Sequence, residues 1–157
     1  VGAVAEKLDN DLKDVDTPLF LRVLNGSFMF TADLVRKMGI QPDVVFIKLA
    51  SYEGTESTGK VKQIMGLTSS VKGKTVVIVE DIVETGNTIE EMYNILKKEG
   101  AADIKVCTLL FKPQAYKKDI AIDYAALQIP NDFIVGYGLD YNQLGRQYKD
   151  IYVLDEE

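Results

Sequence analysis

The sequence contains no histidine, and this absence limits the chemistry that the protein can use. Histidine is the commonest general base near neutral pH and the commonest side-chain ligand of metal ions. Without it, a carboxylate becomes the natural catalytic base. A bound metal ion must be held by oxygen atoms, which favours Mg²⁺ or Mn²⁺.

Cysteine, positive charge and long apolar runs are also scarce. Cys107 is the one cysteine and lies in an apolar run, so we expect a buried thiol and no internal disulfide. The 18 basic and 24 acidic residues give a net charge of −6, which argues against a nucleic-acid partner. No apolar stretch is long enough for a membrane span, and residues 1–12 do not resemble a signal peptide. We therefore expect a soluble cytoplasmic protein, and the start at Val1 rather than Met is consistent with missing N-terminal residues.

The 157 residues suit one domain of alternating strands and helices. The hydrophobic patterns predict helices at residues 4–12, 28–38 and 89–99, and strands at residues 19–24, 44–49, 76–79, 104–110, 133–136 and 151–154. This alternation predicts an α/β fold with a doubly wound, mostly parallel sheet flanked by helices. Ligands of such sheets bind beyond the carboxyl ends of the strands.

Residues 76–88, VVIVEDIVETGNT, carry the most specific functional signal. A run of four apolar residues, typical of a buried parallel strand, is followed by Glu80 and Asp81. Thr88 and Glu91 then have the spacing of a capping box at the start of a helix. The amino end of a helix favours an anion such as phosphate. The residues expected to cradle that phosphate are Thr85, Gly86, Asn87 and Thr88.

The two acids would repel a phosphate unless another group lay between them and it. A sugar is such a group, because carboxylates accept hydrogen bonds from ribose hydroxyls. The segment therefore predicts a ribose 5-phosphate ligand, with Glu80 and Asp81 on the ribose. The sequence has neither of the common glycine-rich phosphate motifs. The alternative is an ordinary strand-to-helix turn with solvated acids.

This segment resembles the phosphoribosyl-pyrophosphate (PRPP) signature of the type I phosphoribosyltransferases. Further segments resemble the hypoxanthine-guanine members of that family, in the same order along the chain, and the resemblance extends over residues 19–154. It implies the type I fold, with a small hood contributed by the C-terminal part. It also implies purine salvage: hypoxanthine, and guanine as well, would react with PRPP to give IMP or GMP and pyrophosphate.

Two segments resemble the parts of the family that contact pyrophosphate. In LNGS, residues 24–27, the resemblance assigns Asn25 and Gly26 to pyrophosphate, although many relatives have lysine where Asn25 stands. The alternative is a simple turn capped by Ser27. Residues 50–60 are rich in Ser, Thr and Gly and predict a mobile lid, with Ser51 and Tyr52 as its contacts. A plain surface hairpin is the alternative there.

Purine recognition is assigned by resemblance to the C-terminal part of the chain. Lys112 would donate to the 6-oxo group, Phe133 would stack on the base, and Ile134 would contact its edge through the backbone. Within residues 130–148, Asp140 would hold a second Mg²⁺ near the purine and Arg146 would reach pyrophosphate. If each residue is taken alone, the alternative is that Lys112 is solvated, Phe133 belongs to the core and Asp140 is an acid in a turn.

The predicted mechanism depends on Mg²⁺ and on a carboxylate base. Mg²⁺ would bridge pyrophosphate and the ribose hydroxyls, with Glu80 and Asp81 beside the sugar and Asp140 at a second ion. Catalysis would use Glu84, Lys112 and Arg146. The family has aspartate where Glu84 stands, and the extra methylene shifts the carboxylate by more than about 1 Å unless the loop is reshaped.

Two alternatives remain open at this point. One is a phosphoribosyltransferase that prefers xanthine, since such enzymes differ by subtle contacts around Ile134 and Asp140. The other is a non-catalytic regulator that senses PRPP and binds RNA or DNA, which the net negative charge opposes. By analogy with relatives we expect a homodimer or homotetramer.

Overall fold

The computed structural model describes residues 1–23, 26–53, 60–65 and 70–154. Helices and strands alternate along most of the chain, as the hydrophobic patterns predicted. In chain order the elements are α1 (Gly2–Leu12), β1 (Leu19–Val23), α2 (Phe28–Lys37), β2 (Asp43–Glu53), β3 (Lys60–Met65), β4 (Thr75–Val83), α3 (Asn87–Lys98), β5 (Asp103–Phe111), β6 (Tyr124–Gln128), β7 (Ile134–Val135) and β8 (Tyr152–Val153).

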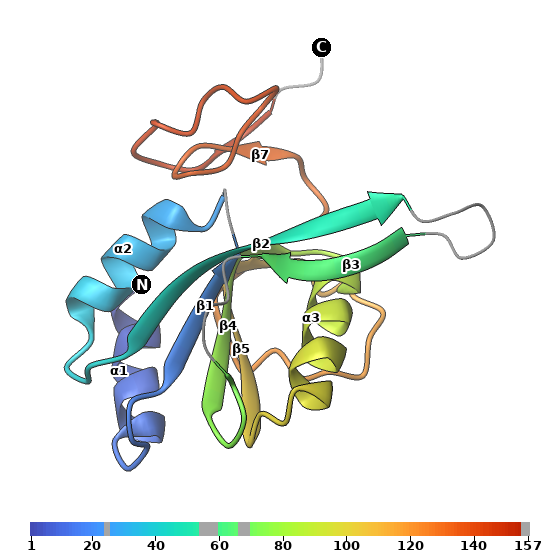
Figure 1. Cartoon of the computed structure of the whole chain (residues 1–157). Helices are drawn as coiled ribbons and strands as arrows, with labels where there is room; N and C mark the ends of the chain where they lie inside the picture. Colours follow the sequence, from blue (N-terminus) through green and yellow to red (C-terminus); the bar gives the residue numbers. More distant parts are fainter. Residues whose placement is uncertain (24–25, 54–59, 66–69, 155–157) are drawn as a thin grey trace.

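The main sheet has the strand order β3-β2-β1-β4-β5-β6. Strands β2, β1, β4, β5 and β6 run parallel, and β3 is antiparallel to β2. Figure 1 shows α1 and α2 on one face of this sheet and α3 on the other. This arrangement confirms the expected doubly wound α/β fold.

A hydrophobic core fills each face of the sheet. Alternate residues of β1 supply the two cores, because successive side chains of a strand point to opposite faces. Phe20 belongs to the core under α1 and α2, whereas Leu19 and Leu21 belong to the core under α3. Cys107 is fully buried in β5, as expected, and burial raises the pKa of its thiol.

Several element boundaries differ from the sequence-based expectations. β2 continues to Glu53 and pairs with β3, a strand that we did not predict, although its sequence KVKQIM alternates polar and apolar residues. β6 was also missed, because it is a short edge strand that is only partly buried. β4 extends to Val83 rather than ending at Val79, because the long apolar run of β5 supplies hydrogen-bonding partners along residues 80–83.

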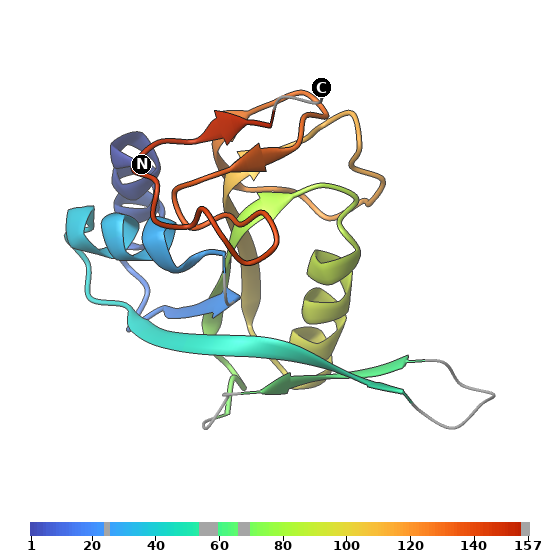
Figure 2. The ribbon, with the colours of Figure 1, turned by 90° about the horizontal axis from the view of Figure 1, so that it is seen from above.

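A hood, which we define as residues 130–154, follows the main sheet. It contains the antiparallel pair β7 and β8, in which Ile134 lies opposite Val153. Figures 1 and 2 show the hood above one edge of the sheet, next to the start of α2. The small hood predicted for the C-terminal part is therefore present. Among the described residues, no helix combines the length and apolarity required to cross a membrane.

Candidate active site

Glu80 and Asp81 lie within β4, not in the loop that follows it. They occupy the last part of the strand, with Glu80 opposite Thr108 of β5. Glu80 is only 6% exposed, and its Oε1 has no hydrogen-bond partner in the described part of the chain. Asp81 Oδ1 accepts a hydrogen bond of 2.8 Å from the backbone N–H of Ile82. The strand therefore holds two adjacent carboxyl groups, one of which has an unused acceptor.

Burial dominates the electrostatics of this acid pair. It raises the pKa of Glu80 well above the usual range for a glutamate, and the adjacent Asp81 charge raises it further. Burial also raises the pKa of Asp81, although its hydrogen bonds and the positive charge of Arg146 act in the opposite direction. Two adjacent carboxylates, one buried and one partly buried, disfavour a double negative charge. The pair is therefore suited to meeting a cation or a set of hydroxyl donors.

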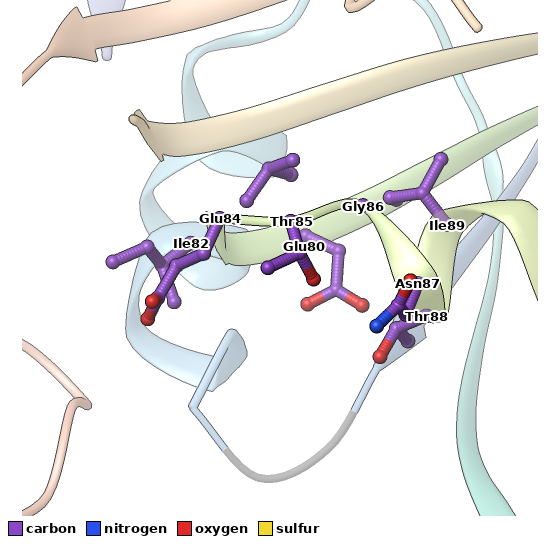
Figure 3. A pocket seen from close by; sticks show the side chains of 9 residues that line it. Glu80, Ile82, Glu84, Thr85, Gly86, Asn87, Thr88 and Ile89 are labelled. Atoms are coloured by element: carbon purple, nitrogen blue, oxygen red, sulfur yellow. The ribbon is translucent and has the colours of Figure 1, made fainter. Parts of the chain in front are cut away.

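A pocket of about 260 Å³ lies between Glu80 and the start of α3. Figure 3 shows the Glu80 carboxylate lying between Thr85 and the pair formed by Asn87 and Thr88. The first turn of α3 has backbone N–H groups without partners inside the helix, which favour an anion there. The lining residues are Glu80, Ile82, Val83, Glu84, Thr85, Gly86, Asn87, Thr88 and Ile89. Glu80 and all four residues expected to bind phosphate thus share one pocket.

The capping box predicted at Thr88 and Glu91 is wrong. α3 begins at Asn87, so Thr88 is already inside the helix, and the N-cap residue is Gly86. Gly86 has φ +88°, a left-handed conformation that glycine adopts readily, and its carbonyl accepts a 2.9 Å hydrogen bond from the Glu90 N–H. The helix can therefore start earlier, without a side-chain cap.

A segment that the sequence gave no reason to include packs behind the phosphate loop. A β-carbon on Gly86 would lie 2.6 Å from the Tyr116 ring and 2.7 Å from Cγ of Lys118. The Lys117 N–H donates to the Thr85 carbonyl at 3.3 Å. Lys118 Nζ lies 3.3 Å from a carboxylate oxygen of Glu90 in the first turn of α3. These contacts hold the loop through residues that do not line the pocket, and no local motif in the segment could have revealed them.

Glu84 and Lys112 come together from two neighbouring strand ends. Lys112 Nζ lies 3.6 Å from Glu84 Oε1, and the Lys112 side chain is buried while that of Glu84 is about half exposed. The Lys112 N–H donates to the carbonyl of Val83 at 3.0 Å. Figure 3 shows Glu84 pointing away from Asn87 and Thr88. Glu84 therefore lines the pocket away from Asn87 and Thr88, and Lys112 stands beside the pocket without lining it.

The hood contributes an aromatic ring and a guanidinium group. Phe133 is 53% exposed, which excludes a core role, and its ring makes an edge contact with Tyr141 at a centroid distance of 6.0 Å. Ile134 is buried. Arg146 Nη2 lies 3.4 Å from Asp140 Oδ1, and Arg146 Nη1 donates to the Gly138 carbonyl at 2.7 Å. The arginine is thus held within the hood by two partners.

Gly26 lies between the acid pair and the hood. A β-carbon on Gly26 would lie 1.8 Å from Asp81 Oδ2, and one on Gly138 would lie 2.6 Å from the Gly26 carbonyl oxygen. Ser27 precedes α2, but its hydroxyl donates back to the carbonyl of Val23 at 2.6 Å and does not cap the helix. Ser27 therefore occupies the N-cap position of α2, as the alternative expected, but its side chain does not make the capping hydrogen bond. Asn25 lies outside the described residues.

Ser51 and Tyr52 lie in a strand and not in a loop. They belong to β2, opposite Lys62 and Val61 of β3. The described residues of segment 50–60 therefore form the two arms of an antiparallel pair, as the hairpin alternative predicted. Backbone pairing of this kind requires no apolar side chains, and the lid remains a prediction. Residues 54–59 of the expected lid lie outside the described residues.

The acid pair fits a single oxygen-bound metal ion that arrives with a substrate. Mg²⁺ usually takes one or two carboxylates together with substrate phosphates and water. Glu80 and Asp81 match this donor set, and Glu80 Oε1 is unpartnered among the described atoms. The described residues contain no cluster of three or more acidic or thiol side chains arranged to hold a metal. Asp140 is instead engaged by Arg146 and, through Oδ2, by the Gln143 N–H at 2.8 Å.

Comparison with known proteins agrees with this geometry. Residues 1–142 match the family model of the phosphoribosyl transferase domain. A hypoxanthine-guanine phosphoribosyltransferase of Staphylococcus epidermidis is 40% identical over 144 residues, covering 90% of this chain and 80% of the relative.

Solved structures give the same result at the level of the fold. A hypoxanthine phosphoribosyltransferase of Staphylococcus aureus superposes with a TM-score of 0.83 at 38% identity, over 98% of this chain and 86% of the other. A variant of the Trypanosoma cruzi enzyme in complex with its product IMP gives a TM-score of 0.86 at 36% identity, over 98% and 83%. With an acid pair, a phosphate loop and a hood in the expected places, the chain belongs to the phosphoribosyltransferase family.

Proposed function

We propose that this protein transfers the phosphoribosyl group of PRPP to hypoxanthine and guanine, giving IMP or GMP and pyrophosphate. The observation that carries the proposal is that Glu80 and the loop of residues 85–88 line one pocket at the start of a helix. A ribose 5-phosphate needs both an acceptor for its hydroxyls and an anion site for its phosphate. The staphylococcal relative is named for hypoxanthine and guanine and the trypanosomal one for hypoxanthine, which supports this choice of substrates.

The ribose ring would lie over the acid pair, with its hydroxyls donating to Glu80 and Asp81. The 5′-phosphate would accept hydrogen bonds from the N–H groups at the start of α3 and from the side chains of Thr85, Asn87 and Thr88. Gly26 would present its backbone to pyrophosphate because no side chain blocks the approach. We assign Asn25, Ser51, Tyr52 and Arg146 to the same leaving group.

Mg²⁺ would be held by Glu80 and Asp81 together with substrate oxygens, and Asp140 is our candidate near a second ion. When bound, Mg²⁺ supplies positive charge to the departing pyrophosphate. The chain itself orients the sugar through the acid pair and the phosphate through the loop. Such positioning accounts for much of the rate in transfers of this type.

The purine would lie under the hood, stacked on Phe133 and bordered by Ile134. Lys112 would donate to its 6-oxo group. In the reaction the purine nitrogen forms a bond to C1′ while the bond from C1′ to pyrophosphate breaks, and Glu84 accepts the proton that the purine loses. The 3.6 Å approach of Lys112 Nζ to Glu84 Oε1 supports this assignment, because it brings the proposed base and the proposed donor to the 6-oxo group to the same place.

The test is a spectrophotometric assay of hypoxanthine, guanine, xanthine and adenine in parallel, each with PRPP and Mg²⁺. We expect turnover of hypoxanthine and guanine, and none of adenine, which has no 6-oxo group. Glu80→Gln should abolish the activity. Asp103→Asn, which changes an exposed acid at the opposite end of the sheet, should not. A preference for xanthine would favour the near alternative, and inactivity with every 6-oxopurine would refute the proposal.

We also propose that the protein acts in the cytoplasm as a homodimer or homotetramer, without a nucleic-acid or membrane partner. The trypanosomal relative has been studied for its oligomeric state, which makes assembly a relevant variable. Light scattering coupled to gel filtration would measure the assembly. Filter binding to RNA at low salt should show no affinity, since a nucleic-acid-binding regulator would bind in a salt-dependent way.

A further inference from the structure

The turn of residues 136–138 has an unusual backbone. Gly136, Tyr137 and Gly138 all have positive φ, of 103°, 50° and 97°. Neither glycine leaves room for a side chain. A β-carbon on Gly136 would lie 2.2 Å from the Asp150 carbonyl oxygen, and a β-carbon on Gly138 would lie 2.6 Å from the Gly26 carbonyl oxygen. Tyrosine rarely adopts such a φ, so other contacts must hold Tyr137 there.

Tyr137 is held by partners from two directions. Its backbone N–H donates to the carbonyl of Tyr148 at 2.8 Å, within the hood. Its hydroxyl donates to the carboxylate of Asp33 in α2. Burial, followed by the hydrogen bond to Asp33 and the charge of that carboxylate, raises the pKa of the Tyr137 phenol. The hydroxyl therefore stays protonated and remains a donor throughout the neutral range.

This hydrogen bond joins two parts of the molecule that flank the proposed reaction. Asp33 lies on α2, the helix that follows Gly26 and Ser27 directly. The next residue after Tyr137 is Gly138, which packs on Gly26. The Gly138 N–H donates to the Arg146 carbonyl at 2.9 Å, and Arg146 Nη1 donates to the Gly138 carbonyl at 2.7 Å. The position of Gly26 relative to Arg146 therefore depends on how this turn is seated.

We propose that Tyr137 is a positioning residue that, through its hydrogen bond to Asp33, seats the hood on the turn at Gly26 so that both can engage pyrophosphate. The inference rests on the proposed function, because it concerns the leaving group of that reaction. Tyr137 itself need not touch a substrate. It acts through Gly138, which meets Gly26 and Arg146.

Tyr137→Phe removes only the hydroxyl, and Tyr124→Phe is its matched control. The Tyr124 hydroxyl also donates to an aspartate on a helix, Asp11, at 2.7 Å, but it joins β6 to α1 away from the hood. Both variants lose one partly buried tyrosine–aspartate hydrogen bond. A difference in their kinetics must therefore arise from where the bond lies and not from its loss alone.

In the reverse reaction of IMP with pyrophosphate, we expect Tyr137→Phe to raise KM for pyrophosphate about tenfold, because the two pyrophosphate contacts lose their fixed separation. The inhibition constant of ribose 5-phosphate against PRPP should stay within about twofold, since the acid pair and phosphate loop are untouched. Tyr124→Phe should leave both constants within about twofold of wild type. A change confined to pyrophosphate is not expected from a general loss of stability.

Aspartate variants complete the test. Asp33→Ala should match Tyr137→Phe, and the double variant should be no worse than either single one, because all three lack the same bond. Asp33→Asn keeps an oxygen acceptor and should stay close to wild type, which gives a readout even if Tyr137→Phe folds poorly. Wild-type pyrophosphate kinetics in folded Tyr137→Phe, or equal changes in Tyr124→Phe, would overturn the inference. An inactive wild-type protein would instead refute the proposed function.

Discussion

Gly26 lies so close to Asp81 that a β-carbon on the glycine would stand 1.8 Å from Asp81 Oδ2. A contact of that length is impossible, so a side chain at this position would have to displace either the carboxylate or the turn. The close approach joins the residue proposed to meet pyrophosphate to one of the acids proposed to meet the ribose. Gly26 and Asp81 would then lie on opposite sides of the bond between ribose C1′ and pyrophosphate, which breaks in the reaction.

Gly26→Ala should therefore lower kcat/KM for PRPP by about a hundredfold, the cost of misplacing a reacting group by about 1 Å. Initial-rate kinetics would measure the loss. The matched control is Gly2→Ala, since a β-carbon there meets no atom within 4 Å. Full activity in folded Gly26→Ala would show that the turn and Asp81 can separate without harm.

Glu84→Gln should lose most of its turnover but still bind the nucleotide product. The amide preserves the size of the side chain but cannot accept the purine proton, and loss of a general base typically costs about 10²–10⁴-fold in kcat. The dissociation constant of IMP should change little, because Glu84 is turned away from the phosphate-binding residues. Unchanged turnover would remove Glu84 from the mechanism, and calorimetric titration with IMP would supply the binding comparison.

Glu80→Gln should stabilise the protein at alkaline pH while it inactivates the enzyme. The pKa of Glu80 is raised in the folded state, so the folded protein binds this proton more tightly than the unfolded chain does. The ionised carboxylate consequently destabilises the fold above its folded pKa, and the penalty disappears as the pH falls toward the unfolded value.

We expect the substitution to raise the free energy of unfolding by about 1–3 kcal/mol at pH 8, and by little at pH 4.5. Urea unfolding at the two pH values would measure this difference. An equal effect at both values would mean that burial of the charge is not the cause.

Gly86→Ala should destabilise the protein and weaken binding of ribose 5-phosphate. Two costs combine: φ is +88°, and the new methyl group would collide with the Tyr116 ring at 2.6 Å and with Lys118 at 2.7 Å. We expect a loss of about 2–4 kcal/mol in the free energy of unfolding.

Gly73→Ala separates these two costs. Gly73 also has a positive φ, of 74°, but a β-carbon there meets nothing within 4 Å. It should lose only about 1 kcal/mol, and ribose 5-phosphate should still bind. Equal losses in the two variants would mean that the segment at Tyr116 and Lys118 does not support the loop.

The sequence predicted the strands and helices whose own residue pattern matches the structure that they adopt. The apolar run before Glu80 marks a buried parallel strand, and the helices that flank it follow from their periodicity. The end of β4 could not be predicted in this way, because its last part carries two acids that read as a loop. Their strand conformation comes from hydrogen bonding to β5, which is a property of the neighbour and not of the segment.

The same reasoning applies to the candidate site. Motifs along the chain predicted Glu80, the phosphate loop and Lys112 as site residues, since each stands at or beyond the end of an apolar run. Contacts between distant glycines left no local signature: nothing in the residues around Gly26 indicates that Gly138 packs on it. The bond from Tyr137 to Asp33 is equally invisible before folding, because it joins residues more than a hundred positions apart.

The burial of Cys107 makes the protein convenient to label. Its thiol lies fully inside β5, and its raised pKa keeps the reactive thiolate scarce, so alkylating reagents should reach it only when the sheet opens. Because the chain has no other cysteine, a cysteine engineered on the outside of the hood would be the one fast-reacting site for a fluorophore. Movements of the hood during turnover could then be followed by fluorescence in an otherwise wild-type background.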